Sequence, residues 1–394
     1  MRAERAKVAV SAVFMLNGLA FASWISRVPA LRDSLDLTPG GIGLLLLSLS
    51  GGTLVALPAS GAVIGHLGAR RTVLAGAGMT CAGLLVVALG LATDSVVTVG
   101  VGMFTYGIGT SGWDVAMNVE AADVEHRLAR TIMPRFHAGF SLGTVVGALT
   151  GAACAHFDIS LATQLVGAVV VIAVVVPVTV RAFLPVDAQT EGTRAARPSL
   201  LSVWTEPRTL AIGLLVLAFA LCEGIANDWL ALTLVDGYDA DESVGAAGFG
   251  VFVAAMTLGR LLGGSPVERF GRVNVLRSTA LLVVTGVLVV VFSPGLPGAL
   301  AGAAVWGVGA SLGFPLGMSA AADDERRSAV RLSVVSSIGY AAFLGGPPLV
   351  GLLADQVGVR QAVLVACGAA ALGLLVSSAS ASQRTAPVAT PPRS

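Results

Sequence analysis

Long apolar runs follow one another through almost the whole chain. The segments 42–64, 72–91 and 164–180 approach or exceed the roughly 20 apolar residues with which an α-helix spans a bilayer. Charged residues make up only 12% of the chain, about half of their usual share in a soluble domain. The sequence lacks the polar and apolar alternation that would predict a membrane barrel. We therefore expect an all-α integral membrane protein.

Twelve transmembrane helices are predicted from these runs. They cover residues 8–28, 41–64, 72–92, 96–119, 135–156, 160–183, 210–234, 244–265, 273–293, 297–320, 332–354 and 359–379. A polar stretch with three prolines and no apolar period separates the first six spans from the last six. We therefore expect an N-terminal six-helix bundle at 1–184, a cytoplasmic linker at 185–208, a C-terminal six-helix bundle at 209–380 and a disordered tail at 381–394.

The basic residues are distributed unevenly between the two predicted membrane faces. With the N-terminus on the cytoplasmic side, all but four of the 24 Lys and Arg residues fall on that side; the exceptions are Arg27, Arg32, Arg260 and Arg360. Basic residues near span ends are retained in the cytoplasm. Both termini are therefore expected there, with the chain in a bacterial-type inner membrane.

The second half of the chain repeats the first at an offset of 200 to 205 residues. The clearest matches are Gly107-Ile-Gly-Thr-Ser with Gly307-Val-Gly-Ala-Ser, and Ala121-Ala-Asp-Val-Glu with Ala321-Ala-Asp-Asp-Glu. Because each copy holds an even number of spans, the copies form two parallel bundles related by an axis along the membrane normal. Two such bundles can rock about a central site, a geometry that suits alternating access.

Composition and motifs also restrict the partners and cofactors. The formal net charge of +1 and the lack of basic tracts argue against a nucleic-acid partner. The four cysteines have no metal-ligand or redox spacing, and no phosphate-binding loop with a following Lys is found. We expect no cofactor, no metal and no enzyme activity. The expected protein is a monomer whose partners are the lipid bilayer, a small-molecule solute and a proton.

One loop resembles the signature of a known transporter family. The sequence Gly264-Ser-Pro-Val-Glu-Arg-Phe-Gly-Arg, after the eighth predicted span, is similar to the Gly-x-x-x-Asp-Arg-x-Gly-Arg loop of the major facilitator superfamily, with Glu268 in place of Asp. The first-half copy departs from the pattern, with Gly65 where the acid belongs and His66 where Arg usually stands. The resemblance covers the whole span region. It implies the major facilitator fold of two parallel-repeat bundles and the function of a transporter.

The same resemblance implies a cytoplasmic gate. In the family, the loop acid holds neighbouring helix ends together through an Arg and a helix N-terminus. Glu268 with Arg269 and Arg272 is expected to do so here, and Arg70 and Arg71 occupy the first-half copy. The alternative is that these arginines only fix the topology.

Further segments are similar to the fucose-permease-like bacterial branch of the superfamily. They are Trp24-Ile-Ser-Arg-Val-Pro, Phe136-His-Ala-Gly-Phe-Ser-Leu-Gly, Glu223-Gly-Ile-Ala-Asn-Asp-Trp and Gly259-Arg-Leu-Leu-Gly. The fifth span holds Gly139, Gly143, Gly147 and Gly151 without the proline typical of drug–proton antiporters. We interpret this glycine ladder as close helix packing at a moving interface.

Ionisable side chains within the predicted spans are the first candidates for chemistry. Such groups cost roughly 2.5 to 3.5 kcal/mol on insertion scales, so they usually face a cavity or a partner. Glu223 lies near the middle of the seventh span, with Asn227 on the same face, and could carry a proton or contact the solute. Arg260 could hold an anionic solute group or balance a carboxylate. The alternative for both is a structural bond to a neighbouring helix.

A second candidate for proton coupling joins the fourth and fifth spans. Asp114 has Asn118 one turn further along and Trp113 beside it, and His137 lies at a similar depth in the next span. Antiparallel neighbours could bring the carboxylate and the imidazole together as a proton relay. A helix-end hydrogen bond without function is the alternative.

The remaining candidates are polar and aromatic residues expected to line a substrate cavity. Asn17, Phe21 and Trp24 share one face of the first span, which suits a sugar-like or aromatic solute. Trp24 could instead belong to the aromatic belt of the membrane. The expected cavity residues are Asn17, Phe21, Trp24, Trp113, Asn118, Gln164, Asn227, Asp228 and Trp306.

The sequence thus predicts a secondary active transporter that moves a small organic, sugar-like solute across the inner membrane by alternating access, coupled to protons. Two alternatives stay open. One is a drug/proton efflux antiporter, and the other is a non-transporting membrane sensor that retains the fold.

Overall fold

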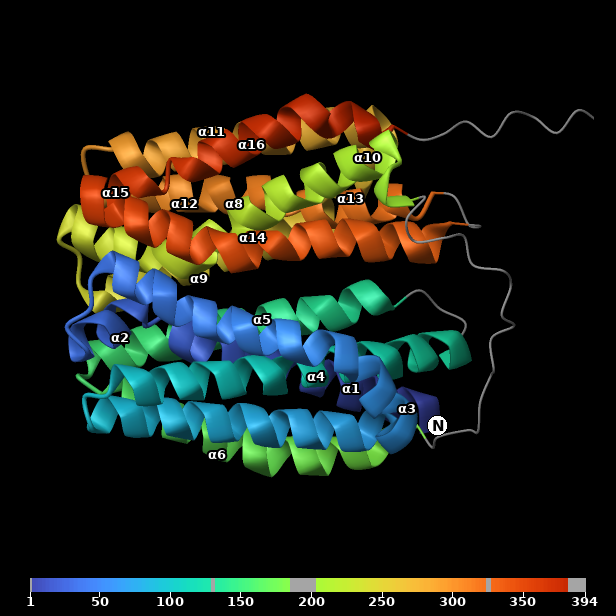
Figure 1. The fold of residues 1–394 in the computed structure, drawn as a ribbon, viewed down its shortest axis with the longest axis horizontal. Coiled ribbons are helices and arrows are strands. Elements are labelled where there is room, and N and C mark those ends of the chain that lie inside the picture. Colours follow the sequence, from blue (N-terminus) through green and yellow to red (C-terminus); the bar gives the residue numbers. More distant parts are fainter. Residues whose placement is uncertain (1, 129–131, 185–202, 324–326, 382–394) are drawn as a thin grey trace, which may run out of the picture.

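A computed structural model of the chain describes residues 2–128, 132–184, 203–323 and 327–381, and these residues form helices and connecting turns without any strand (Figure 1). The first half contains α1 (Arg2–Ile25), α2 (Val28–Ser34), α3 (Pro39–Ala92), α4 (Val96–Leu128), α5 (Met133–His156), α6 (Leu161–Thr179) and the short 3-10 helix η1 (Val180–Ala182). The second half contains α8 (Pro207–Tyr238), α9 (Glu242–Leu262), α10 (Gly264–Phe270), α11 (Arg272–Phe292), α12 (Leu296–Ala310), α13 (Gly313–Ala321), α14 (Ser328–Val357), α15 (Val359–Ala362), α16 (Val365–Val376) and η2 (Ser377–Ser380). The predicted all-α fold is confirmed.

The helices account for the twelve predicted spans. Ten helical segments of the described residues are long and apolar enough to cross a membrane. One of them, α3, holds two spans, because its backbone leaves the helical conformation at Gly68, with φ 77° and ψ 160°. The remaining span is α4, which has 33 residues but whose apolar character is diluted by Gly, Thr and Ser.

The two halves repeat the same irregular backbone positions. Gly68 has φ 77° and ψ 160°, and Gly271 in the second half has φ 79° and ψ 158°. Asp36, with φ 48°, likewise corresponds to Asp239, with φ 49°. Both pairs are separated by the offset of the sequence repeat. Glycine adopts positive φ at little cost, and Asp does so more readily than most residues. The turns between helices are therefore encoded twice, at equivalent positions.

The helices pack into two bundles that lie side by side (Figure 1). In the first, α1 packs against α4, α5 and α6, while α3 packs against α4 and α6. In the second, α8 packs against α9, α14 and α16, while α11 packs against α12 and α16. Between the bundles, α5 contacts α9, α3 contacts α14, and α2 contacts α8 and α9. We call the face on which α1 and α8 begin the termini side, and the face with α2 and α15 the far side.

The glycine ladder of α5 packs on α1 of the same bundle. A Cβ atom added to Gly143 would lie 1.9 Å from the carbonyl oxygen of Met15, and one added to Gly147 would lie 2.6 Å from Cβ of Ala22. Glycine therefore lets the two helices approach closely. The prediction of close packing is confirmed, and the ladder faces α1 of its own bundle; movement at this interface stays a prediction.

The end of the predicted linker belongs to the second bundle. Helix α8 begins at Pro207, two residues before the predicted boundary, and Val203 is buried against Val334 and Ile338. The rest of the linker, and all of the predicted tail except Ala381, lie outside the described residues.

Glu206, directly before α8, joins this segment to α14. Arg331 Nε donates to Glu206 Oε2 at 2.9 Å, and Thr209 Oγ1 donates to the same oxygen at 2.8 Å. Burial alone would raise the pKa of Glu206, but these hydrogen bonds and the charge of Arg331 outweigh it and hold the pKa below the ordinary value of 4.5. A carboxyl with a lowered pKa stabilises the fold while it is ionised. Its contribution is therefore present above the ordinary value and is lost as the pH falls through the lowered one.

We expect Glu206→Gln to reduce the free energy of unfolding by about 1 kcal/mol at pH 7, a modest value because the carboxylate is partly exposed and screened. Melting curves of the purified protein, recorded at pH 7 and at steps below 4.5, measure the effect. The variant should melt below the native protein at pH 7, and the two curves should converge in acid. An equal gap at every pH would mean that the charge contributes nothing.

Candidate functional site

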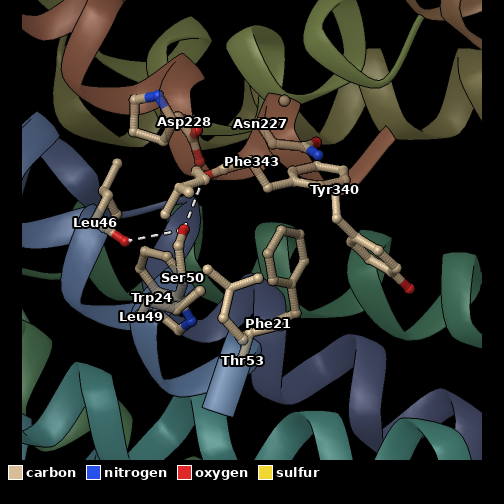
Figure 2. A pocket seen from close by; sticks show the side chains of 14 residues that line it. Phe21, Trp24, Leu46, Leu49, Ser50, Thr53, Asn227, Asp228, Tyr340 and Phe343 are labelled. Carbon is tan, nitrogen blue, oxygen red and sulfur yellow. Dashed lines mark hydrogen bonds between the residues drawn. The ribbon is translucent and has the colours of Figure 1, made fainter. Parts of the chain in front are cut away.

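A pocket of ≈ 150 Å³ lies between the two bundles, lined by α1 and α3 from the first and by α8 and α14 from the second (Figure 2). On each helix most lining residues are three, four or seven positions apart, so they share one helix face. They are Phe21, Trp24, Leu46, Leu49, Ser50, Thr53, Leu54, Gly224, Asn227, Asp228, Tyr340, Phe343, Leu344 and Pro347.

Four aromatic rings and one carboxylate give the pocket its chemistry. Phe21 and Trp24 meet edge to face, with ring centroids 6.1 Å apart. Tyr340 and Phe343, with ring centroids 6.4 Å apart, come from the opposite bundle (Figure 2). Asp228 is the only carboxylate among the lining residues. The pocket therefore combines aromatic surface with a single acidic group.

An ion pair lies next to the pocket, one helical turn nearer the termini side. Arg260 Nη2 on α9 donates to both carboxylate oxygens of Glu223 on α8, at 3.0 and 3.1 Å. Arg260 Nε also donates to the carbonyl oxygen of Ser311, at 3.2 Å. The Glu223 and Arg260 side chains are 20% and 31% exposed, so the pair is only partly buried. Arg260 thus balances the carboxylate of Glu223 within the second bundle.

The structure does not join Asp114 to His137. Asn118 Nδ2 donates to the backbone oxygen of Asp114 at 2.9 Å, and the His137 ring meets Phe14 edge to face at 5.3 Å. In the described residues no hydrogen bond or ion pair connects the two side chains. His137 instead lies within electrostatic range of Arg260. The predicted relay between α4 and α5 is therefore not assembled in this conformation.

On the far side, Arg27 ties the two bundles together. Its side chain is almost fully buried, at 4% exposure, and pairs with Glu242 at the start of α9. Arg27 Nη2 donates to Glu242 Oε2 at 3.1 Å, and Nη1 donates to Gln164 Oε1 at 2.9 Å. Gln164 in turn donates to the backbone oxygen of Ser23 at 2.9 Å. Arg27 of the first bundle thus joins Gln164 of its own bundle to Glu242 of the second bundle.

Two more contacts close the same side. Arg32 on α2 pairs with Asp236 on α8. Asp355 at the end of α14 accepts from the backbone N–H of Gly40 at 2.9 Å, at the N-terminus of α3, where a negative charge is favoured. At the pocket itself, Ser50 Oγ donates to the backbone oxygen of Phe343 at 2.7 Å (Figure 2).

On the termini side the bundles are apart. Nearly every side chain of α3 from 61 to 67 is exposed, and a Cβ atom added to Gly61 or Gly65 would meet no atom within 4 Å. If this segment of α3 packed against both bundles, neighbouring helices would cover most of its side chains. The structure is therefore closed on the far side and open on the termini side.

The predicted gate residues lie within single bundles in this conformation. Arg272 Nη1 pairs with Asp323 at 3.1 Å, and Arg208 reaches the same carboxylate at 3.2 Å. Arg269 lies over the ring of Phe270, 5.2 Å from its centroid. For the other three, Glu268, Arg70 and Arg71, no ion pair is found in the described chain. The acid that anchors Arg272 is thus Asp323 and not the expected Glu268.

Five expected cavity residues lie away from the pocket. Trp113 and Trp306 are fully buried in helix packing inside their bundles. Gln164 belongs to the Arg27 network, and Asn118 bonds to its own helix. Asn17 is 3% exposed, and its Nδ2 has no partner among the described residues. Phe21, Trp24, Asn227 and Asp228 do line the pocket.

A family model described as Major Facilitator Superfamily matches residues 10–324 and 229–393. The chain belongs to the Major Facilitator Superfamily. Within it, the chain is 34% identical over 354 residues to the uncharacterized transporter y4wD of Sinorhizobium fredii, covering 89% of this chain and 92% of that relative. The predicted superfamily and its fold are therefore confirmed.

Two solved structures of transporters share this superfamily fold. The nucleoside transporter NupG matches with a TM-score of 0.79 at 14% identity, over 95% of this chain and 99% of that one. The E. coli fucose:proton symporter FucP matches with a TM-score of 0.63 at 15% identity, over 95% of this chain and 98% of that one. At these identities the similarity extends to the fold alone.

Several residues of the pocket and of the contacts between the bundles escaped prediction. Ser50 and Thr53 lie in an apolar run in which no polar spacing stands out, and only the fold turns them toward the pocket. Tyr340 and Phe343 form an aromatic pair at i, i+3 in the eleventh span, and that spacing could have identified them. Glu242 and Asp355 gain their roles only because the bundles meet.

Proposed function

We propose that this chain is a secondary active transporter that carries a small organic solute across the inner membrane by alternating access, coupled to protons. The observation that carries the proposal is the pocket between the two bundles, closed on one side by reversible polar contacts and open on the other. Breaking those contacts and closing the termini side would expose the same pocket to the opposite face. Superfamily membership supports this function.

The distribution of basic residues supports an orientation with both termini in the cytoplasm. Arg70 and Arg71 lie on the termini side, as do Arg208 and Arg272. In this orientation the described conformation faces the cytoplasm. Arg27, Arg32 and Arg360, the basic residues of the far side, are all engaged in hydrogen bonds.

Glu223 is the residue that we propose for proton coupling. Its carboxylate accepts two hydrogen bonds from Arg260, and loss of that partner would leave a charge without its counterion, which is costly inside a bundle. Both side chains are partly exposed. Movement of α8 against α9 would break this pair, and we propose this as the step that links the conformation to the proton.

Glu223→Gln is expected to separate solute movement from the proton gradient. The native protein in proteoliposomes should accumulate a solute when a pH gradient is imposed, and the variant should lose at least tenfold of that accumulation while still exchanging the solute across the membrane. Asp94→Asn, at an exposed turn of the first bundle, is the matched control. Gradient-driven accumulation that persists in Glu223→Gln would remove Glu223 from the coupling step.

The transport function itself can be tested before the solute is identified. Proteoliposomes and protein-free liposomes are incubated with a metabolite mixture under a pH gradient, and their contents are compared by mass spectrometry. We expect at least one small organic solute to enter only the protein-containing vesicles and to leave when a protonophore is added. Identical contents in both would favour the non-transporting sensor.

A further inference from the structure

The single carboxylate of the pocket has no counterion in the protein. Asp228 is the only acid among the lining residues, which include no Lys, Arg or His. In the described residues its carboxylate forms no hydrogen bond and no ion pair. The basic group of the neighbouring pair, Arg260, is already engaged by Glu223 and Ser311. An unpaired charge at this depth is costly, so a cation from outside the protein would be favoured there.

The aromatic side chains that line the same pocket as Asp228 favour an organic cation in particular. Phe21 and Trp24 come from the first bundle, and Tyr340 and Phe343 come from the second (Figure 2). Aromatic faces attract ammonium groups through the ring quadrupole, and cages of such rings are a recurring way to bind them. A carboxylate in a pocket that is also lined by aromatic rings matches the charge and the apolar surface of an organic amine.

The pocket is poorly equipped for a polyhydroxylated solute. Few polar side chains line the pocket: Asp228, Asn227, Tyr340, Ser50 and Thr53. Of these, Ser50 Oγ already donates a hydrogen bond to the backbone oxygen of Phe343. A sugar-like molecule would leave several hydroxyls without partners, and a buried hydroxyl without a hydrogen-bond partner is unfavourable. The lining thus favours one charged hydrogen-bonding group on an otherwise apolar body.

We propose that the pocket binds a small organic cation, with a protonated amine against Asp228 and a ring or alkyl body among the aromatic side chains. This assignment rests on the proposed transport function and names its substrate class. It replaces the sugar-like solute expected from the sequence.

The test compares three probes that differ in one terminal group: phenethylamine, phenethyl alcohol and hydrocinnamate. Their binding to the full-length protein in nanodiscs is titrated by ligand-observed NMR. We expect the amine to bind at least tenfold more tightly than the alcohol, and hydrocinnamate to bind most weakly. Equal affinities for the amine and the alcohol, or no binding of the amine, would overturn the proposal.

Asp228→Asn keeps the shape of the side chain and removes its charge. It should weaken amine binding at least tenfold and leave alcohol binding within about twofold, since the apolar contacts are kept. Asp239→Asn, an exposed carboxylate just after the same helix, is the control and should keep the preference for the amine. Phe343→Leu should weaken the amine more than the alcohol, because a ring face is lost. A preference for the amine that survives Asp228→Asn would contradict the assignment.

The outcomes distinguish this inference from the proposed function. If vesicles accumulate solutes that are all neutral or anionic, transport stands and the cation assignment fails. If the amine binds through Asp228 but no solute crosses the membrane, the pocket stands and transport fails. If Asp228→Asn removes the response to the proton gradient but leaves amine binding unchanged, the cation assignment also fails, because Asp228 then takes part in proton coupling and not in amine binding.

Discussion

Arg27→Gln is expected to shift the protein toward a conformation that is open on the far side. Arg27 is almost fully buried and holds Glu242 of the second bundle together with Gln164 of the first. Removing one member of a buried ion pair typically costs about 3 to 5 kcal/mol, because the remaining charge loses its partner. A penalty of about 3 kcal/mol against the far-closed conformation changes its population ratio roughly 100-fold.

The measurement is the distance between spin labels at Ser34 on α2 and Gln361 on α15, which are both exposed on the far side but belong to different bundles. The four native cysteines are replaced first. We expect the distance distribution to shift to longer values in Arg27→Gln. Glu242→Gln, which leaves the buried guanidinium of Arg27 without its counterion, should shift it in the same direction.

Arg360→Gln is the matched control for this effect. Arg360 lies on the same side, donates to the backbone oxygens of Val291, Gly237 and Ser293, and lies over the ring of Tyr238, all within the second bundle. Its loss should lower stability without changing the distance. If both variants moved the labels equally, the Arg27 network would not be what holds the bundles together.

Gly143→Ala is expected to destabilise the first bundle by about 3 kcal/mol, at the upper end of the cost of overpacking. The added methyl group would lie 1.9 Å from the backbone oxygen of Met15, a contact that no side-chain rotation can relieve. Helices α1 and α5 must therefore move apart. Since Phe21 and Trp24 are carried by α1, the pocket would be disturbed as well.

Gly167→Ala on α6 is expected to stabilise the same bundle, the opposite of the effect of Gly143→Ala. A Cβ atom at Gly167 meets nothing within 4 Å, so the substitution should stabilise the helix by roughly 0.5 to 1 kcal/mol. Melting temperatures of the two variants in detergent measure the contrast. A Gly143→Ala protein that melts no lower than the native one would mean that α1 and α5 are not packed as closely as described.

The fold was predictable because each membrane span can be recognised from its own apolar sequence. A run of about 20 apolar residues must form a helix in lipid, and the turn residues Gly68 and Gly271, or Asp36 and Asp239, recur at the offset of the repeat. The apolar pattern does not reveal the exact residue at which a helix begins or ends. Thus α8 begins at Pro207, before the predicted boundary.

The site was predictable only in part, and the failures have a common cause. Phe21, Trp24, Asn227 and Asp228 were identified because aromatic and polar residues are rare inside spans. Trp113 is just as unusual in sequence, yet it is fully buried in helix packing. A single helix does not determine which of its faces meets the central pocket, because that depends on its neighbours.

The carboxylate of Asp355 completes the first turn of α3 only while the far side is shut. When the bundles separate there, water must take over as the acceptor for the N–H groups at the start of that helix. A residue that does not line the pocket thus helps to hold the two bundles together on the far side. Dissolved salt, which weakens such contacts between charges and helix ends, should therefore weaken this contact between the bundles.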